Sequence, residues 1–123
     1  MHVTRFAEAP EYSAPGHDGM RCLRMLGKEA CPSGFAWMGL SIIEPGGCIQ
    51  PSASPYEKLY LVVEGELEFS GGGAPTTLGR WDACRFAPGE ERMIANRSGR
   101  QATVVLAMAN MILDSDTGAA RSA

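Results

Sequence analysis

Residues 46–65, GGCIQPSASPYEKLYLVVEG, carry the strongest structural signal in this chain. At fixed intervals between its first and last glycines lie three polar side chains: Ser52, Ser54 and Lys58. The second half of the stretch is rich in branched and aromatic residues, which favours a β-strand. Gly65 interrupts that strand-like run and predicts a tight turn between two strands, because glycine adopts backbone conformations that other residues avoid.

Other apolar runs in the chain also have the composition of β-strands. With the run just described, they cover residues 20–26, 35–44, 58–69, 83–87, 92–96 and 102–110. Segments rich in glycine, proline or asparagine separate them, at residues 45–47, 70–73, 88–89 and 96–99. Several short strands at this spacing predict an antiparallel β-sandwich or barrel.

The length of 123 residues predicts a single domain. We expect an extended N-terminal arm over residues 1–19, a barrel over residues 20–112 and a flexible C-terminal tail over residues 113–123. The net charge is −3 and the basic residues are scattered, which argues against a nucleic-acid partner. We see neither an apolar run that could span a membrane nor a secretory signal, so a cytoplasmic location is expected. The four cysteines form no CxxC pair and are interpreted as reduced, small apolar residues.

Two blocks of the sequence resemble the motifs of the cupin family. The first is the stretch 46–65, which keeps both glycines and every interval of the family's first motif. The second begins at Trp81, sixteen residues after Gly65, and matches the family's second motif at Gly89 and Asn96. The resemblance covers about residues 35–110. The short interval between the two blocks is similar to that of compact bacterial members of the family. The resemblance implies an all-β fold, the antiparallel double-stranded β-helix or jelly-roll barrel.

The family's metal ligands are three histidines and a glutamate, and none of them is present at the matching positions. Those positions carry Ser52, Ser54, Lys58 and Arg92. Two cations would repel a divalent ion, and neutral hydroxyls are weak ligands for transition metals. We therefore predict no metal at the usual site and no cofactor. A displaced metal site remains an alternative, with ligands drawn from Cys48, Glu57, Glu66 or His17.

The family frame also predicts which side chains face the interior. If Lys58 points inward, strand alternation places Tyr60 and Val62 beside it, while Leu59 and Leu61 point outward. The outward leucines form an apolar stripe, from which we predict a homodimer. If Arg92 points inward, Ile94 shares its side.

The predicted cavity is cationic and partly apolar. Its ligand-binding residues would be Ser52, Ser54, Lys58, Val62, Arg92 and Ile94. Such a cavity suits a small organic anion, a carboxylate or an enolate with an apolar or aromatic body. The alternative is that Lys58 extends to the barrel mouth or pairs with a buried acid, such as Glu66 or Asp82, and that nothing binds.

Three functions remain open. The first is a metal-independent lyase, isomerase or hydrolase, in which Lys58 is a base or nucleophile, Arg92 holds the anion and Tyr60 assists proton transfer. The second is a binding or sensing module without catalysis. The third is a metal-dependent cupin enzyme with displaced ligands. The sequence favours the first, because inward lysine and arginine are hard to explain as packing residues.

Overall fold

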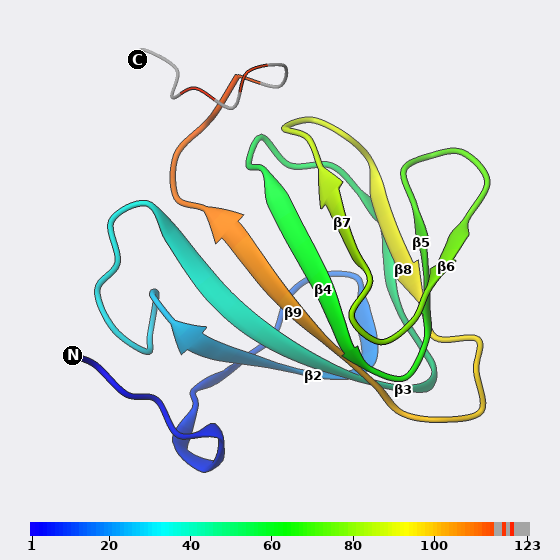
Figure 1. The fold of residues 1–123 in the computed structure, drawn as a ribbon, viewed down its shortest axis with the longest axis horizontal. Helices are drawn as coiled ribbons and strands as arrows, with labels where there is room; N and C mark the ends of the chain where they lie inside the picture. The colour runs from blue at the N-terminus through cyan, green and yellow to red at the C-terminus, as the bar shows by residue number, and fades with distance from the viewer. Residues whose placement is uncertain (115–116, 118, 120–123) are drawn as a thin grey trace.

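The computed structural model describes residues 1–114, 117 and 119, which form a short 3-10 turn and nine β-strands (Figure 1). In chain order these are η1 (Phe6–Glu8), β1 (Glu11–Tyr12), β2 (His17–Leu26), β3 (Ala36–Ser52), β4 (Lys58–Glu64), β5 (Leu67–Ser70), β6 (Thr76–Leu78), β7 (Ala83–Phe86), β8 (Arg92–Ala95) and β9 (Ala102–Ala109). The predicted all-β class is confirmed. Within the described part of the chain, no helix is long and apolar enough to cross a membrane.

All strand pairings are antiparallel, and the sheet bends into a nearly closed barrel. Its strand order is β6-β5-β8-β3-β9-β4-β7, with β2 also paired to β3 and β1 to β2. The long strand β3 belongs to both layers, because residues 36–43 pair with β9 and residues 48–52 pair with β8. Figure 1 shows β2, β3, β9, β4 and β7 as one broad layer, with β8, β5 and β6 beyond it.

The predicted break at residues 45–47 is wrong, since β3 continues through Pro45-Gly46-Gly47 to Ser52. The glycines allow this because Gly46 adopts a φ of +83°, which bends the strand without ending it. Two backbone hydrogen bonds to Asn96 hold the bent segment of β3 in place. The Gly46 amide donates to the Asn96 carbonyl, and the Asn96 amide donates to the Gly47 carbonyl, both at 2.9 Å. The bend redirects β3 from the first layer to the second.

The predicted turn at Gly65 is confirmed between β4 and β5. Gly65 has a φ of +77°, and a Cβ atom there would lie 2.7 Å from the Gln101 carbonyl oxygen. The position therefore requires glycine both for its conformation and for the close approach of the neighbouring backbone. Strand β6 (Thr76–Leu78) was not predicted, because it is only three residues long and two of them are threonines.

The N-terminal segment is more structured than a plain extended arm. It contains η1, and its strand β1 pairs with β2 through Glu11–Leu23 and Tyr12–Cys22. Strand β2 itself begins at His17, three residues earlier than the sequence predicted. Most of the predicted flexible tail lies outside the described residues, at positions 115–116, 118 and 120–123.

The hydrophobic core lies between the two layers and is built from alternating positions of the strands. In β4 the side chains of Lys58, Tyr60 and Val62 are buried, whereas Leu59 and Leu61 are 47% and 36% exposed. The predicted alternation of this strand is thus confirmed. The rest of the core comes from both layers and includes Ile43, Ile49, Leu67, Phe69, Phe86, Ile94, Ala102 and Val104.

Candidate functional site

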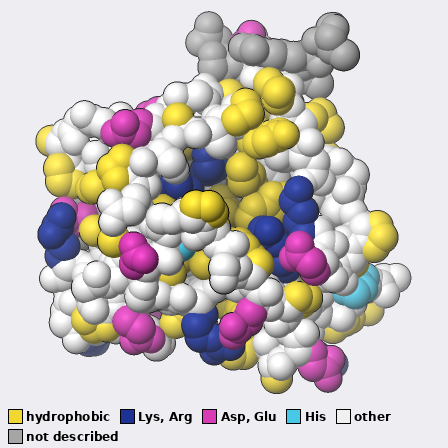
Figure 2. All heavy atoms as spheres, turned by 180° about the vertical axis from the view of Figure 1, so that it is seen from behind, with side chains coloured by type: hydrophobic (Ala, Val, Ile, Leu, Met, Phe, Trp, Pro, Cys, Tyr) yellow, Lys and Arg dark blue, Asp and Glu magenta, His cyan; other side chains and the backbone are white. Residues whose placement is uncertain are grey.

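A cavity of about 450 Å³ lies between the barrel and the N-terminal segment. Four of its lining residues occupy the positions singled out from the sequence: Ser52, Ser54, Lys58 and Arg92. The remaining residues after position 19 on its wall are Arg24 and three apolar or aromatic residues, Trp37, Leu106 and Met108. Seen from behind, the surface of the molecule is hollowed, and Lys and Arg side chains lie there beside hydrophobic ones (Figure 2).

Lys58 is the first residue of β4 and is only 4% exposed. Its Nζ donates a hydrogen bond of 2.6 Å to the Oγ of Ser54, which lies in the loop between β3 and β4. Burial lowers the pKa of the Lys58 amine, and the positive charge of Arg92 lowers it further. The site therefore favours a neutral amine more than water does.

Arg92 opens β8 and is 6% exposed. The β3–β8 register places it opposite Ser52, and its Nη2 donates to the Ser52 Oγ at 2.6 Å. Its Nη1 donates to the Tyr60 hydroxyl at 3.3 Å. Its Nε is buried without a hydrogen-bond partner. Two neutral hydroxyl oxygens thus orient the guanidinium group, and its Nε–H donor has no acceptor.

Tyr60, Val62 and Ile94 lie deeper than the sequence predicted. Val62 and Ile94 are fully buried in the core and are not on the cavity wall. Tyr60 packs its ring against Phe69 and Phe86, with centroid distances of 5.6 and 5.9 Å. Burial raises the pKa of the Tyr60 hydroxyl. Tyr60 and Val62 follow Lys58 at two-residue intervals on the inward side of β4, and Ile94 follows Arg92 in the same way on β8.

The N-terminal segment supplies a wall that the sequence did not predict. Residues 12–15 and His17 line the cavity, because β1 and β2 pair and lay this segment against the barrel. The Nδ1 of His17 donates to the Pro15 carbonyl at 2.9 Å. Burial lowers the pKa of His17, and the charge of Arg92 also lowers it, although the Pro15 carbonyl opposes the shift. His17 therefore favours the neutral imidazole.

Arg24 lines the same cavity and stacks against two aromatic rings. Its guanidinium carbon lies 3.4 Å from the ring centroid of Tyr12 and 4.3 Å from that of Trp37. Its Nε donates to a Glu29 carboxylate oxygen at 2.9 Å, so its charge already has a partner. No spacing in the sequence pointed to Arg24, since Tyr12, Arg24 and Trp37 come from three different strands or their edges.

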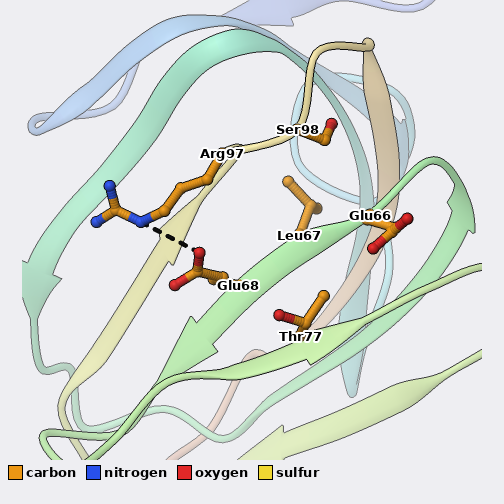
Figure 3. Close-up of a pocket in the computed structure, with 6 residues that line it drawn as sticks. All are labelled: Glu66, Leu67, Glu68, Thr77, Arg97 and Ser98. Atoms are coloured by element: carbon orange, nitrogen blue, oxygen red, sulfur yellow. Dashed lines mark ion pairs between the residues drawn. The ribbon is translucent and has the colours of Figure 1, made fainter.

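The acids considered as partners for Lys58 lie elsewhere. Asp82 accepts a hydrogen bond of 2.9 Å from the Gly79 amide and so caps a turn. Glu66 borders a shallow surface pocket with Leu67, Glu68, Thr77, Arg97 and Ser98, where Arg97 and Glu68 form an ion pair of 3.2 Å (Figure 3). Among the described residues that line the main cavity, none is Asp or Glu.

The donor set does not fit the metal that the fold family would imply. The matching positions carry hydroxyl, ammonium and guanidinium groups, and the one imidazole nearby is that of His17. The proposed replacements are also dispersed, because Glu57 pairs with Arg85 and Cys48 accepts a weak hydrogen bond from Gln50. Over the described residues, no group of three or more His, Cys, Asp or Glu side chains is placed to hold a metal ion.

Comparisons with known proteins agree with this architecture. The model of the Cupin_2 family, the cupin domain, matches residues 39–108. A Mycobacterium tuberculosis protein named beta-D-galactosidase Rv1717 is 39% identical over 114 residues, which cover 93% of this chain and 98% of that protein.

Solved structures show the same fold at low sequence identity. The polyketide cyclase RemF from Streptomyces resistomycificus has a TM-score of 0.79 at 14% identity, over 89% of this chain and 79% of that one. A cupin-superfamily sugar phosphate isomerase from Silicibacter pomeroyi has a TM-score of 0.73 at 18% identity, over 87% of this chain and 74% of that one. With the fold, the two motif blocks and the family match in agreement, this chain belongs to the cupin-domain family.

Proposed function

We propose that this protein binds a small organic anion in the cavity, with Lys58 and Arg92 as its charged contacts and without a metal. The observation that supports the proposal most is the pair of buried cations. Both side chains are at most 6% exposed, both line one cavity, and both donate hydrogen bonds to neutral hydroxyl groups. An isolated buried charge costs several kcal/mol in a folded protein, and a bound anion would offset that cost.

The unpaired donor of Arg92 supports the same proposal. Its Nε is buried without a partner, and buried polar groups in native proteins normally have one. A carboxylate beside the guanidinium would accept a charge-assisted hydrogen bond, which is stronger than a bond to a neutral oxygen. The apolar wall of Trp37, Leu106 and Met108 would receive the body of such a ligand.

The same arrangement would support catalysis. A neutral Lys58 amine is a base and a nucleophile, and burial together with Arg92 favours that form. Arg92 would hold the carboxylate or a developing oxyanion. Tyr60 is the weaker candidate for proton transfer, because burial raises its pKa and its hydroxyl accepts a hydrogen bond from Arg92. A binding module would use the same contacts without turnover.

Calorimetric titration with pyruvate, malonate and benzoate tests the proposal. We expect at least one of these carboxylates to bind and the Arg92→Met variant to lose at least about 10-fold in affinity, since a charge-assisted hydrogen bond contributes roughly 1.5–3 kcal/mol. Arg100→Met is the matched control, because Arg100 is exposed and does not line the cavity. Equal affinity of both variants, or binding of none of the three anions, would overturn the proposal.

A second candidate function comes from the relative named as a beta-D-galactosidase, whose match extends over nearly the whole of both chains. Trp37 and Tyr12 line the cavity as aromatic rings, although the Arg24 guanidinium already stacks on one face of each. Glycosidases generally use two carboxylates, however, and the described cavity wall carries none.

Release of p-nitrophenol from p-nitrophenyl β-D-galactoside tests this second candidate. If the cavity is the site, the wild-type protein hydrolyses the galactoside, and Lys58→Met and Arg92→Met lower the rate while Arg100→Met does not. Hydrolysis that is unaffected by either cavity variant would place the activity elsewhere, and no hydrolysis would remove the candidate.

A further inference from the structure

The loop between β3 and β4 brings a serine hydroxyl and a buried amine into direct contact. The Oγ of Ser54 and the Nζ of Lys58 are 2.6 Å apart, and both residues line the cavity. A buried lysine with a serine as its hydrogen-bond partner is the arrangement by which an amine can activate a hydroxyl nucleophile. We propose that Ser54 and Lys58 form a nucleophile–base pair and that this cupin is an esterase for small carboxylic esters.

The surroundings of Ser54 support a nucleophilic role. The backbone amide of Tyr56 also donates to its Oγ, at 3.3 Å, so that two donors converge on the oxygen where negative charge would develop. The loop is held in place from the other side, because the Gly89 amide donates to the Ser54 carbonyl at 2.8 Å. The hydroxyl is therefore positioned by the backbone as well as by Lys58.

The surroundings of Lys58 support its role as the base. A serine is activated when the amine is neutral, and burial together with Arg92 lowers the lysine pKa. In the structure the Ser54 Oγ donates to the Tyr56 carbonyl at 3.4 Å. For activation, the hydroxyl turns its proton from that carbonyl to the neutral Lys58 Nζ, which accepts it. Among the described residues of the cavity wall, no carboxylate would hold Lys58 in its charged form.

The reaction balances with groups that are present and with water. The Ser54 O–H bond breaks as its proton passes to the Lys58 Nζ, the Oγ bonds to the acyl carbon, and the ester C–O bond breaks. The leaving alcohol oxygen takes the proton from Lys58. A water then attacks the acyl-serine, giving one proton to Lys58, which returns it to the Ser54 Oγ as the carboxylic acid leaves. Arg92, on the same wall, would stabilise the oxyanion of each tetrahedral intermediate.

The inference rests on the proposed function in one respect: the carboxylate released by the reaction is the class of anion that the cavity is proposed to bind. The two ideas can nevertheless fail separately. Binding of a carboxylate requires the Arg92 guanidinium and the protonated form of Lys58, whereas the esterase requires the nucleophilic oxygen of Ser54 and the neutral form of Lys58.

Labelling with methanesulfonyl fluoride tests the pair directly. In this reaction the Ser54 Oγ would bond to sulfur, fluoride would leave, and Lys58 would take the proton. We expect one adduct per chain, located on Ser54 by tandem mass spectrometry, and none in Ser54→Ala. Lys58→Met should slow the labelling by about 100-fold or more, the usual contribution of a general base. Lys28→Met is the matched control and should leave the rate unchanged, because Lys28, the only other lysine, is exposed and off the cavity wall.

The pH profile of the labelling gives a second readout. The rate should rise with pH through a single ionisation below about 10.4, the ordinary pKa of lysine, and this step should be absent in Lys58→Met. An adduct on another residue, equal labelling of Lys58→Met, or no labelling would overturn the inference. If benzoate binds to a protein that is not labelled, the esterase fails and the anion site stands; if neither occurs, both fail.

Discussion

Replacing Lys58 by methionine should make the protein more stable at neutral pH. Methionine keeps the length and flexibility of the lysine stem and removes the charge. Lys58 is almost completely buried, and its Nζ donates a hydrogen bond to the neutral Ser54 hydroxyl. A site that keeps such a cation sacrifices folding free energy for its function.

The expected gain follows from two opposing contributions. Burying a charged group costs several kcal/mol even after the protein relaxes. The hydrogen bond to Ser54 recovers roughly 1.5–3 kcal/mol, as is usual for a bond to a charged group. We therefore expect Lys58→Met to raise the free energy of unfolding by about 1–3 kcal/mol, or roughly 4–12 °C in Tm for a domain of this size.

The gain should depend on pH with a defined sign. The folded protein lowers the pKa of Lys58, so the unfolded chain binds more protons between the folded pKa and the unfolded value of about 10.4. Wild-type stability therefore increases relative to the variant as the pH rises through this window. Below the folded pKa the gain of Lys58→Met is complete, and above about 10.4 it vanishes.

Urea unfolding of the wild type, Lys58→Met and Lys28→Met at several pH values from 6 to 10.5 measures this difference. The exposed Lys28→Met variant should differ from the wild type by less than about 0.5 kcal/mol throughout. A loss of stability in Lys58→Met at neutral pH, or a gain that does not change with pH, would show that the folded protein compensates the buried amine.

Three further predictions concern the barrel. Gly65→Ala should lower the free energy of unfolding by about 2–4 kcal/mol, because an alanine there combines a left-handed conformation with a backbone clash. Gly46→Ala, also at positive φ but with open space around it, should lose only about 1–2 kcal/mol. Similar losses of the two variants in thermal unfolding would contradict the role of the clash. Asn96→Leu should cost about 3–5 kcal/mol in urea unfolding, because its amide group satisfies the carbonyls of Ile43 and Arg100 and the amide of Ser98; a loss below 1 kcal/mol would show that water replaces them. We also propose a homodimer through the outward face of β4, so light scattering should give twice the chain mass of 13.1 kDa, and Leu59→Glu should give a monomer; a wild-type monomer would rule this out.

The sequence was sufficient to predict the barrel because its signals are local. The interval between the glycines at 46 and 65 and the alternation of β4 both lie within one stretch of chain, and the structure confirms the inward side of Lys58 and the outward side of Leu59 and Leu61. Trp81 shows where the match to the family's second motif is incomplete. The family has glycine at this first position of the motif, and Trp81 adopts a positive φ of +74° that is typical of glycine, so the backbone follows the motif although the side chain does not.

The cavity could be predicted only on its barrel side. The two motif blocks placed Ser52 and Arg92 at one site, and the structure shows that they meet through the β3–β8 register. The opposite wall depends on how the N-terminal segment folds back, and this is set by a two-residue strand and by the pairing of β2 with β3. Short pairings of this kind leave no periodic pattern, so the contributions of His17 and Arg24 could not be read from the sequence.

A high-resolution crystal structure of the protein grown with malonate would identify what occupies the cavity beside Lys58 and Arg92. We expect a carboxylate within hydrogen-bond distance of the Lys58 Nζ and of the Arg92 guanidinium, with no anomalous signal from a transition metal. A metal ion coordinated in the cavity would show that the proposed anion site is wrong. So would a cavity without malonate, in which both cations keep only their hydroxyl partners.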